Sequence, residues 1–202
     1  MPDTFFKILG GTDPVNQTLG VMTQGLGYPL RDVEPAVSGG AVTVDIRSVL
    51  EASSFVDQIP TSLGVALQLT LGGAQATPEF SVDVLGNITC LIADQYNVRV
   101  RLVTGRRGGG AATAQIYARG LINGTPVGYS SHSIIDNADI EIPLTYSDVR
   151  NFEVGDVLTF QIIRDTDGNN SGGLYAGVPD VVGWASSPSA LITIDRIVAV
   201  TP

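Results

Sequence analysis

The sequence predicts an all-β fold, an antiparallel β-sandwich that follows an extended N-terminal arm. Three observations support this prediction: from residue 41 onward the chain consists of short apolar and β-branched segments, turn residues separate them at regular intervals, and several segments alternate apolar with polar residues. Such alternation places one face of a strand in the core and the other at a surface. We therefore divide the 202-residue chain into an arm, residues 1–40, and a β-domain, residues 41–202.

The arm is rich in Gly, Pro, Asn, Gln and Thr, and its X-Pro pairs interrupt regular structure. Large apolar residues distinguish it from a free linker, which usually lacks such anchors. We therefore expect the arm to lie along another surface, either a partner or a sister subunit. Its candidate partner-binding residues are Phe5, Phe6, Ile8, Leu9, Met22, Leu26 and Tyr28.

The strands of the β-domain are expected where apolar segments lie between turn signals. In chain order they are 42–49, 64–71, 79–84, 88–93, 96–104, 114–121, 125–131, 138–143, 157–164 and 190–200. Three of them alternate clearly, and this predicts inward-facing side chains. These are Tyr96, Val98, Val100 and Leu102 in the first, Leu158, Phe160 and Ile162 in the second, and Ile192 and Ile194 in the third.

Short turns between the strands favour hairpins over helical crossovers. Asn123-Gly124 is the pair that a type I′ turn prefers, because both central residues need positive φ, and residues 85–87 form a similar connection. Helices are expected only as short candidates at 46–56 and 146–152, each of which is equally compatible with the end of a strand. Neither is long enough to determine the fold.

Composition limits the kinds of partner and compartment. Hydrophobic residues make up 44% of the chain and charged residues 15%, a balance typical of a folded domain. The net charge of −9 disfavours nucleic acid as a partner, because the protein and phosphate repel each other. No apolar run is long enough to span a membrane and no secretory signal is visible, so we expect synthesis in a cytoplasm and no membrane association. The single cysteine, Cys90, excludes an internal disulfide and is expected to be buried.

A catalytic site is not expected. His132 is the only histidine, and no Gly-x-Ser-x-Gly nucleophile motif accompanies it, so a surface or turn position is the better interpretation. One histidine and one cysteine supply too few ligands for zinc. The single tryptophan, Trp184, is expected to pack before the last strand, and the low aromatic content disfavours a saccharide-processing groove. We therefore expect a non-enzymatic protein.

One polar loop has a weak resemblance to a calcium site. Asp165, Asp167 and Asn169 place oxygen-bearing side chains at alternate positions, as calcium loops do. An EF-hand would need glycine where Asn170 stands and glutamate where Ala176 stands. A turn held by Asx hydrogen bonds is therefore the favoured interpretation, calcium is the weaker alternative, and no cofactor is expected.

Two adjacent arginines are the last candidates for a partner contact. Arg106 and Arg107 stand before a run of three glycines, which offers bare amides but lacks the Lys-Ser/Thr of a phosphate loop. We interpret this segment as a loop between strands. Its arginines are expected to be free to pair with carboxylates of a neighbouring subunit or partner.

Several segments together are similar to a known family. They are Asp94-Gln-Tyr-Asn-Val-Arg-Val, Thr104-Gly-Arg-Arg-Gly-Gly, Ala118-Arg-Gly-Leu-Ile-Asn-Gly-Thr-Pro-Val-Gly, Val154-Gly-Asp-Val-Leu-Thr-Phe-Gln-Ile-Ile-Arg-Asp, Asn169-Asn-Ser-Gly-Gly-Leu and Ser187-Pro-Ser-Ala-Leu-Ile-Thr-Ile. They resemble, in the same order, the strands of jelly-roll domains of the tumour-necrosis-factor or C1q kind in tailed-phage head decoration proteins and head fibres. Asp94-Gln departs from the glycine turn that the family tends to have before the tyrosine.

The resemblance implies an antiparallel sandwich of jelly-roll type and a homotrimer attached to a virion. The first functional hypothesis is a decoration or cement protein on the capsid exterior, which binds the major capsid protein without catalysis. The alternative is a receptor- or glycan-binding module of a phage fibre or tail appendage, which would use loops 105–112 and 165–175. In the first hypothesis the arms of one trimer would bind the repeating shell with avidity.

Overall fold

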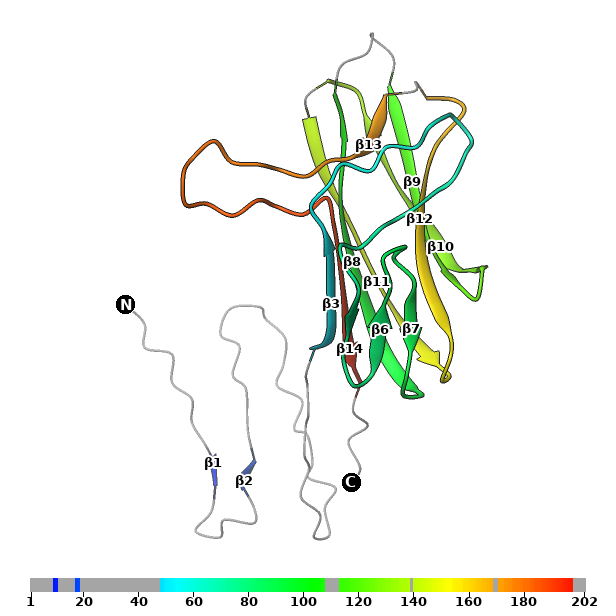
Figure 1. The fold of residues 1–202 in the computed structure, drawn as a ribbon, viewed down its shortest axis with the longest axis vertical. Coiled ribbons are helices and arrows are strands. Elements are labelled where there is room, and N and C mark those ends of the chain that lie inside the picture. The colour runs from blue at the N-terminus through cyan, green and yellow to red at the C-terminus, as the bar shows by residue number, and fades with distance from the viewer. Residues whose placement is uncertain are drawn as a thin grey trace. The chain divides into compact units, whose positions relative to one another are not determined.

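The chain divides into two units, residues 1–43 with 200–202, and residues 44–199. In the first unit, the computed structural model describes two short antiparallel strands, β1 (Leu9–Gly10) and β2 (Gln17–Thr18). In the second unit the strands form two sheets (Figure 1). The residues described are 9–10, 17–18, 48–107, 113–138, 140–168 and 171–197.

The two sheets are antiparallel throughout. The five-stranded sheet has the order β11–β8–β14–β3, with β13 also paired to β8. Its strands are β3 (Ser48–Ser54), β8 (Asp94–Arg106), β11 (Ile140–Phe152), β13 (Gly172–Leu174) and β14 (Ala190–Arg196). The seven-stranded sheet has the order β10–β9–β12–β7–β6–β5, with β4 also paired to β12. Its strands are β4 (Leu67–Gln68), β5 (Gln75–Ala76), β6 (Phe80–Val82), β7 (Ile88–Cys90), β9 (Ala114–Ile122), β10 (Thr125–Ile135) and β12 (Val157–Arg164).

The order of the strands is that of a jelly roll. The chain passes from one sheet to the other between β3 and β4, between β7 and β8, and again between β8 and β9. The late strands then insert between early ones, β12 between β9 and β7 and β14 between β8 and β3. This nesting is the Greek-key pattern that two antiparallel sheets share in a jelly roll. The predicted fold class is therefore confirmed.

Strand alternation is the part of the sequence prediction that the structure follows most closely. All the side chains predicted to face inward from 96–102, 158–162 and 192–194 are buried. The segment 157–164 coincides with β12, and 96–104 lies within a longer strand, β8. Cys90 is also buried, as expected, and its thiol donates to the carbonyl of Ile92.

Other predicted boundaries differ from the observed ones. The candidates at 46–56 and 146–152, for which a helix and the end of a strand were equally compatible, contain β3 and the second half of β11, and the described residues contain no helix. The expected strand 64–71 pairs only at β4, and β13 was not expected. Most of the expected strand 42–49 lies outside the described residues.

The β9–β10 hairpin has the predicted turn. Asn123 and Gly124 have φ values of 51° and 76°, which place both residues in the left-handed region that a type I′ turn requires. The Asn123 side chain also accepts a hydrogen bond from the Val157 amide at 2.9 Å and donates to Asp156 at 2.7 Å. The turn is thereby joined to the start of β12.

Acidic pH is expected to destabilise the domain through carboxylates in its turns. The backbone N–H and the side chain of Asn87 hold the pKa of Asp83 below the ordinary value. The backbone N–H of Glu153 and the side chain of Asn123 do the same for the pKa of Asp156. The backbone N–H of Gln95 and the side chain of Arg196 lower the pKa of Asp94. A pKa that is lower in the folded state contributes stability above the unfolded pKa of about 4, and this is lost as pH falls through the folded pKa.

The free energy of unfolding, measured with urea from about pH 6 down to about pH 2, should therefore begin to fall near pH 4. The double variant Asp83→Asn/Asp156→Asn should show a shallower decline. Asp180→Asn, at an exposed loop position, provides the control. An unchanged pH slope in the double variant would contradict this assignment.

Candidate functional site

One side of the sandwich is incompletely closed. β10 and β11 are edge strands of the two sheets. Three core-facing side chains of β11, Ile142, Leu144 and Tyr146, are only partly buried, whereas those of β8 are fully buried. A narrow, largely apolar crevice lies at this side, and Val127, Tyr146 and Phe160 are among its lining residues. An edge with half-buried apolar side chains is suited to contact with another protein chain.

The hydroxyl group of Tyr146 also favours a contact with another chain. Its hydroxyl is buried without a hydrogen-bond partner among the described residues, and burial raises its pKa. An unsatisfied buried hydroxyl has an energetic cost, which a partner group would relieve. Tyr129, whose side chain is 84% exposed on β10, lines the same crevice. We call this side of the sandwich the open edge; it consists of Ile142, Leu144 and Tyr146 of β11 with Val127 and Tyr129 of β10.

The outer face of the five-stranded sheet has a second feature, a shallow hollow of about 490 Å³. It is lined by Arg99 and Arg101 of β8 together with residues of β11 and β14. Arg99 forms an ion pair with Asp195 at 2.9 Å, and Arg101 has no ion pair with a described residue. The hollow is therefore broad and locally basic in a chain of net charge −9, and most of its lining surface is apolar.

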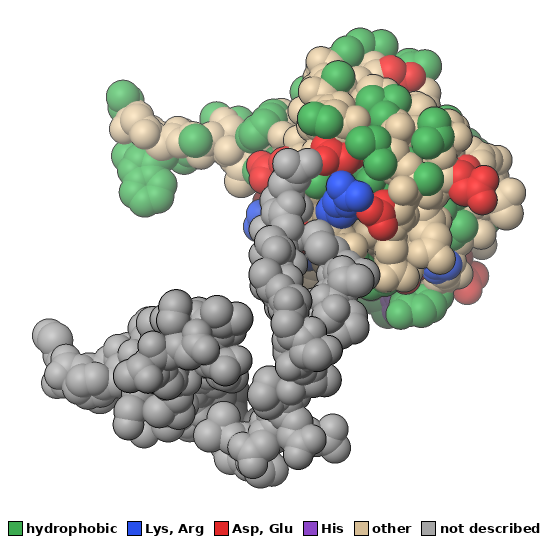
Figure 2. Space-filling model, turned by 90° about the horizontal axis from the view of Figure 1, so that it is seen from below, with side chains coloured by type: hydrophobic (Ala, Val, Ile, Leu, Met, Phe, Trp, Pro, Cys, Tyr) green, Lys and Arg blue, Asp and Glu red, His purple; other side chains and the backbone are tan. Residues whose placement is uncertain are grey.

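A loop between β13 and β14 projects from the sandwich (Figure 1). Backbone hydrogen bonds between Gly177 and Ser187, of 3.1 and 2.8 Å, close its base. The projecting loop, residues 177–188, carries hydrophobic side chains at its end (Figure 2). The exposed fractions are 77% for Val178, 62% for Val181, 99% for Val182 and 75% for Trp184. The expectation that Trp184 packs against the domain is therefore wrong.

The two arginines predicted to be free are engaged within the chain. Arg106 is 2% exposed and donates to the backbone carbonyl of Asp136 at 3.2 Å. Arg107 forms ion pairs with Asp57 at 3.1 Å and Glu141 at 3.3 Å. Its guanidinium also lies 4.5 Å from the centre of the Tyr175 ring. These contacts hold the C-terminal end of β8 in place, and the buried guanidinium of Arg106 needs such acceptors because it is desolvated.

The described residues of the polar loop form the hydrogen bonds of the favoured alternative, an Asx turn. The Asp165 carboxylate accepts from the Asp167 amide at 3.1 Å and from the Thr166 hydroxyl at 3.4 Å, as in an Asx turn. Asn169 lies outside the described residues. No group of three or more His, Cys, Asp or Glu side chains that could hold a metal ion occurs within the described part of the chain.

The other predicted site residues have different outcomes. His132 is exposed on β10 and stacks on Tyr117, with ring centres 5.1 Å apart and planes inclined by 19°. The arm residues Phe5, Phe6, Ile8, Met22, Leu26 and Tyr28 lie outside the described residues, and Leu9 is described only as part of β1.

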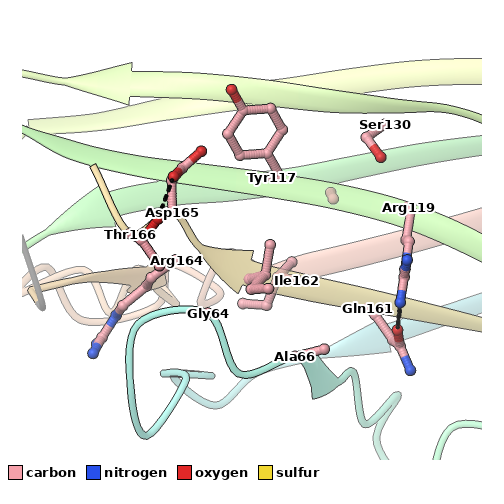
Figure 3. A pocket seen from close by; sticks show the side chains of 12 residues that line it. Gly64, Ala66, Tyr117, Arg119, Ser130, Gln161, Ile162, Arg164, Asp165 and Thr166 are labelled. Carbon is pink, nitrogen blue, oxygen red and sulfur yellow. Dashed lines mark hydrogen bonds between the residues drawn. The ribbon is translucent and has the colours of Figure 1, made fainter. Parts of the chain in front are cut away.

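A pocket of about 340 Å³ lies on the outer face of the seven-stranded sheet (Figure 3). β9, β10, β12 and the segment before β4 supply its lining. Arg119 and Gln161 lie side by side at one end, and Asp165 and Thr166 lie at the other. No motif in the sequence marks this pocket. Alternation alone does place Tyr117, Arg119, Gln161 and Ile163 on the outer face.

The surfaces described above lie on a jelly-roll sandwich, a class of fold that the strand order defines. No family model matches the chain, and no curated protein matches it significantly. Solved structures with some similarity include murine APRIL at pH 8.0, with 10% identity, a TM-score of 0.42 and coverage of 76% of this chain and 100% of that one. The globular domain of zebrafish complement 1qA has 12% identity, a TM-score of 0.43 and coverage of 76% and 96%. Eiger TNF from S. frugiperda has 10% identity, a TM-score of 0.41 and coverage of 77% and 97%.

No described helix is both long enough and apolar enough to span a lipid bilayer.

Proposed function

We propose that this chain is a structural virion protein that decorates and stabilises a phage capsid as a homotrimer, on the capsid exterior and without catalysis. The observation that carries the proposal is the projecting loop with its exposed valines and Trp184. An apolar group of this kind outside the folded body is typical of protein–protein contact. The resemblance of several segments to phage head proteins supports a coat protein as the partner.

The open edge and the hollow support self-association. The open edge presents half-buried apolar side chains on β11, and the hollow lies on the outer face of the same sheet. Tyr146 and Ser147 line both the crevice of the open edge and the hollow, so the two features form one continuous surface. We propose that this surface contacts the neighbouring subunits around a three-fold axis, since rotational symmetry of this kind gives a closed ring. The complex would have a mass of about three times the 21.1 kDa chain.

Attachment would then use the three projecting loops together, with the three arms as further contacts. Once one loop of a trimer has bound, the others bind at a high effective concentration, so weak contacts combine into strong attachment. A protein that binds only the assembled shell stabilises it by mass action. Neither step requires chemistry.

The proposal predicts that adding the protein to bare capsids raises the temperature at which they rupture, and that Trp184→Ala removes most of this effect. Truncation of a buried interface tryptophan costs roughly 2–4 kcal/mol, which corresponds to at least about 30-fold weaker binding at each site. Rupture can be followed by the release of packaged DNA on heating, and binding by cosedimentation with the shells.

The matched control is Leu85→Ala, which removes a similarly exposed apolar side chain from the β6–β7 turn. It should bind and protect the shell like the original protein. Equal protection by the Trp184 variant would remove the loop from the proposal, and unchanged rupture with the original protein would refute the cement role itself.

The alternative is a receptor- or glycan-binding module of a fibre or tail appendage. The observation that favours it is the pocket of Figure 3, whose mainly apolar lining with a few polar side chains is typical of a small-ligand site. This function predicts that the purified protein adsorbs to host cells, which a cement protein has no reason to do. Absence of adsorption at high protein concentration would exclude it.

A further inference from the structure

The pocket on the outer face of the seven-stranded sheet has one wall with aromatic and hydroxyl groups and one wall of small residues. One wall is the Tyr117 side of β9 with Ser130 of β10, and the other is the segment that contains Gly64 and Ala66 (Figure 3). Ile163, the register partner of Tyr117, lines the sheet between the polar ends. With about 340 Å³, the pocket suits a small ring-shaped ligand but not an extended chain.

The polar groups at the Arg119 end are positioned by each other. Arg119 donates through Nε and Nη2 to the Gln161 side-chain oxygen at 3.2 and 2.9 Å. Arg119 has no ion pair with a described carboxylate, so its other N–H groups and the Gln161 amide group retain donors for a ligand. At the opposite end, Asp165 supplies an acceptor.

The aromatic wall is also held in place before any ligand binds. Tyr117 stacks on His132 across the β9–β10 pair, where the two residues are register partners. The stacked pair fixes the phenol ring at the pocket, so little side-chain freedom is lost on binding. A fixed aromatic ring with donors at one end and acceptors at the other forms a preorganised site for a ligand that has both apolar C–H faces and hydroxyl groups.

The lining argues against other ligand classes. A metal ion would find one carboxylate, Asp165, in the pocket. A phosphate would meet one available arginine, because Arg164 is buried and donates its Nε to the Gly172 carbonyl, and it would also face the carboxylate. A purely apolar molecule would leave the guanidinium, amide and carboxylate groups desolvated without partners.

We propose that this pocket binds one pyranose unit of a saccharide. The C–H groups of the sugar ring would pack on Tyr117, adjacent hydroxyls would accept from Arg119 and Gln161, and a further hydroxyl would donate to Asp165. A ligand of about a dozen heavy atoms in an open pocket binds with a dissociation constant on the order of 1 mM. The proposal rests on the alternative function, glycan binding through this pocket, and is independent of attachment to a capsid, so its test requires only the purified protein.

The experiment is saturation-transfer-difference NMR on the full chain with a panel of methyl glycosides: glucoside, galactoside, mannoside and the glycoside of N-acetylglucosamine. At least one should receive saturation at its ring protons. Tyr117→Ala and Arg119→Ala should each lower the affinity at least about tenfold. Phe55→Ala and Arg196→Ala remove an aromatic ring and an arginine that lie outside the pocket, the open edge and the hollow, and should leave binding unchanged.

Ser130→Trp provides a variant that leaves the aromatic pair and the core intact, because it fills the pocket from an exposed position on β10. It should abolish binding while the thermal midpoint stays the same. The proposal is overturned if no glycoside receives saturation at about ten times the expected dissociation constant, or if the Ser130→Trp variant binds normally. It is also overturned if N-acetylglutamate binds this pocket more tightly than every glycoside, because the pocket would then recognise an acidic protein group.

Discussion

Replacing Phe80 with alanine is expected to lower the free energy of unfolding by about 3–5 kcal/mol. Phe80 is completely buried and lies between Tyr96 and Phe152, with ring centres 4.8 and 5.9 Å away and edge-to-face geometry. Phe80 belongs to the seven-stranded sheet and the other two residues to the five-stranded sheet, so the cluster joins the two layers. The substitution removes the buried ring, leaves a cavity and breaks both aromatic pairs.

Urea unfolding at neutral pH measures this loss as a lower midpoint at an unchanged slope. Phe55→Ala is the matched control, since Phe55 is 55% exposed and its removal should change the free energy by less than about 0.5 kcal/mol. Because a domain of this size has only about 5–15 kcal/mol of stability, the Phe80 variant should be close to its unfolding limit at 37 °C. Similar midpoints for the two variants would show that the aromatic cluster does not join the sheets energetically.

The sequence predicts the core best where one face of a strand is uniformly apolar. Tyr96, Val98, Val100 and Leu102 alternate without exception, and the structure buries all of them. Burial selects apolar residues at every second position, and this constraint can be read without knowledge of neighbouring strands. β12 was predicted to its boundaries for the same reason.

β11 was only partly predicted because its inward face changes character along the strand. Ile142, Leu144 and Tyr146 face the core, but the same alternation then continues with Asp148 and Arg150. These two side chains form an ion pair, which lets charged groups occupy the face that a pattern search expects to be apolar. Strand pairing with β8 along the full length of β11 decides the structure there, and local sequence does not encode that pairing.

The candidate sites could not be predicted for a related reason. Trp184 is a large apolar residue that burial statistics place inside, and only the path of the projecting loop carries it away from the core. The pocket combines residues from distant segments, such as Gly64, Tyr117 and Gln161, which strand order brings together. Arg106 looks like a loop arginine in sequence but ends a buried strand.

Gly86→Ala is expected to lower the free energy of unfolding by about 3 kcal/mol or more, by a mechanism that involves no core side chain. Gly86 lies in the β6–β7 turn with φ of 81°, and an added Cβ would stand 2.1 Å from the backbone oxygen of Leu69. The oxygen cannot retreat easily, because Leu69 is buried and its amide donates to the Phe160 carbonyl at 2.9 Å. The cost of the left-handed conformation, about 1–2 kcal/mol, is therefore added to that of moving a backbone segment bound to β12.

Gly124→Ala separates these two costs. Gly124 has a similar φ of 76° in the β9–β10 turn, and a Cβ there would meet nothing within 4 Å. Its variant should lose only the conformational part, about 1–2 kcal/mol, in the same urea measurement. The difference between the two variants then measures how tightly the β6–β7 turn packs against the segment at Leu69. Equal losses would mean that this segment moves aside freely, and that the β6–β7 side of the sandwich is less rigid than its hydrogen bonds indicate.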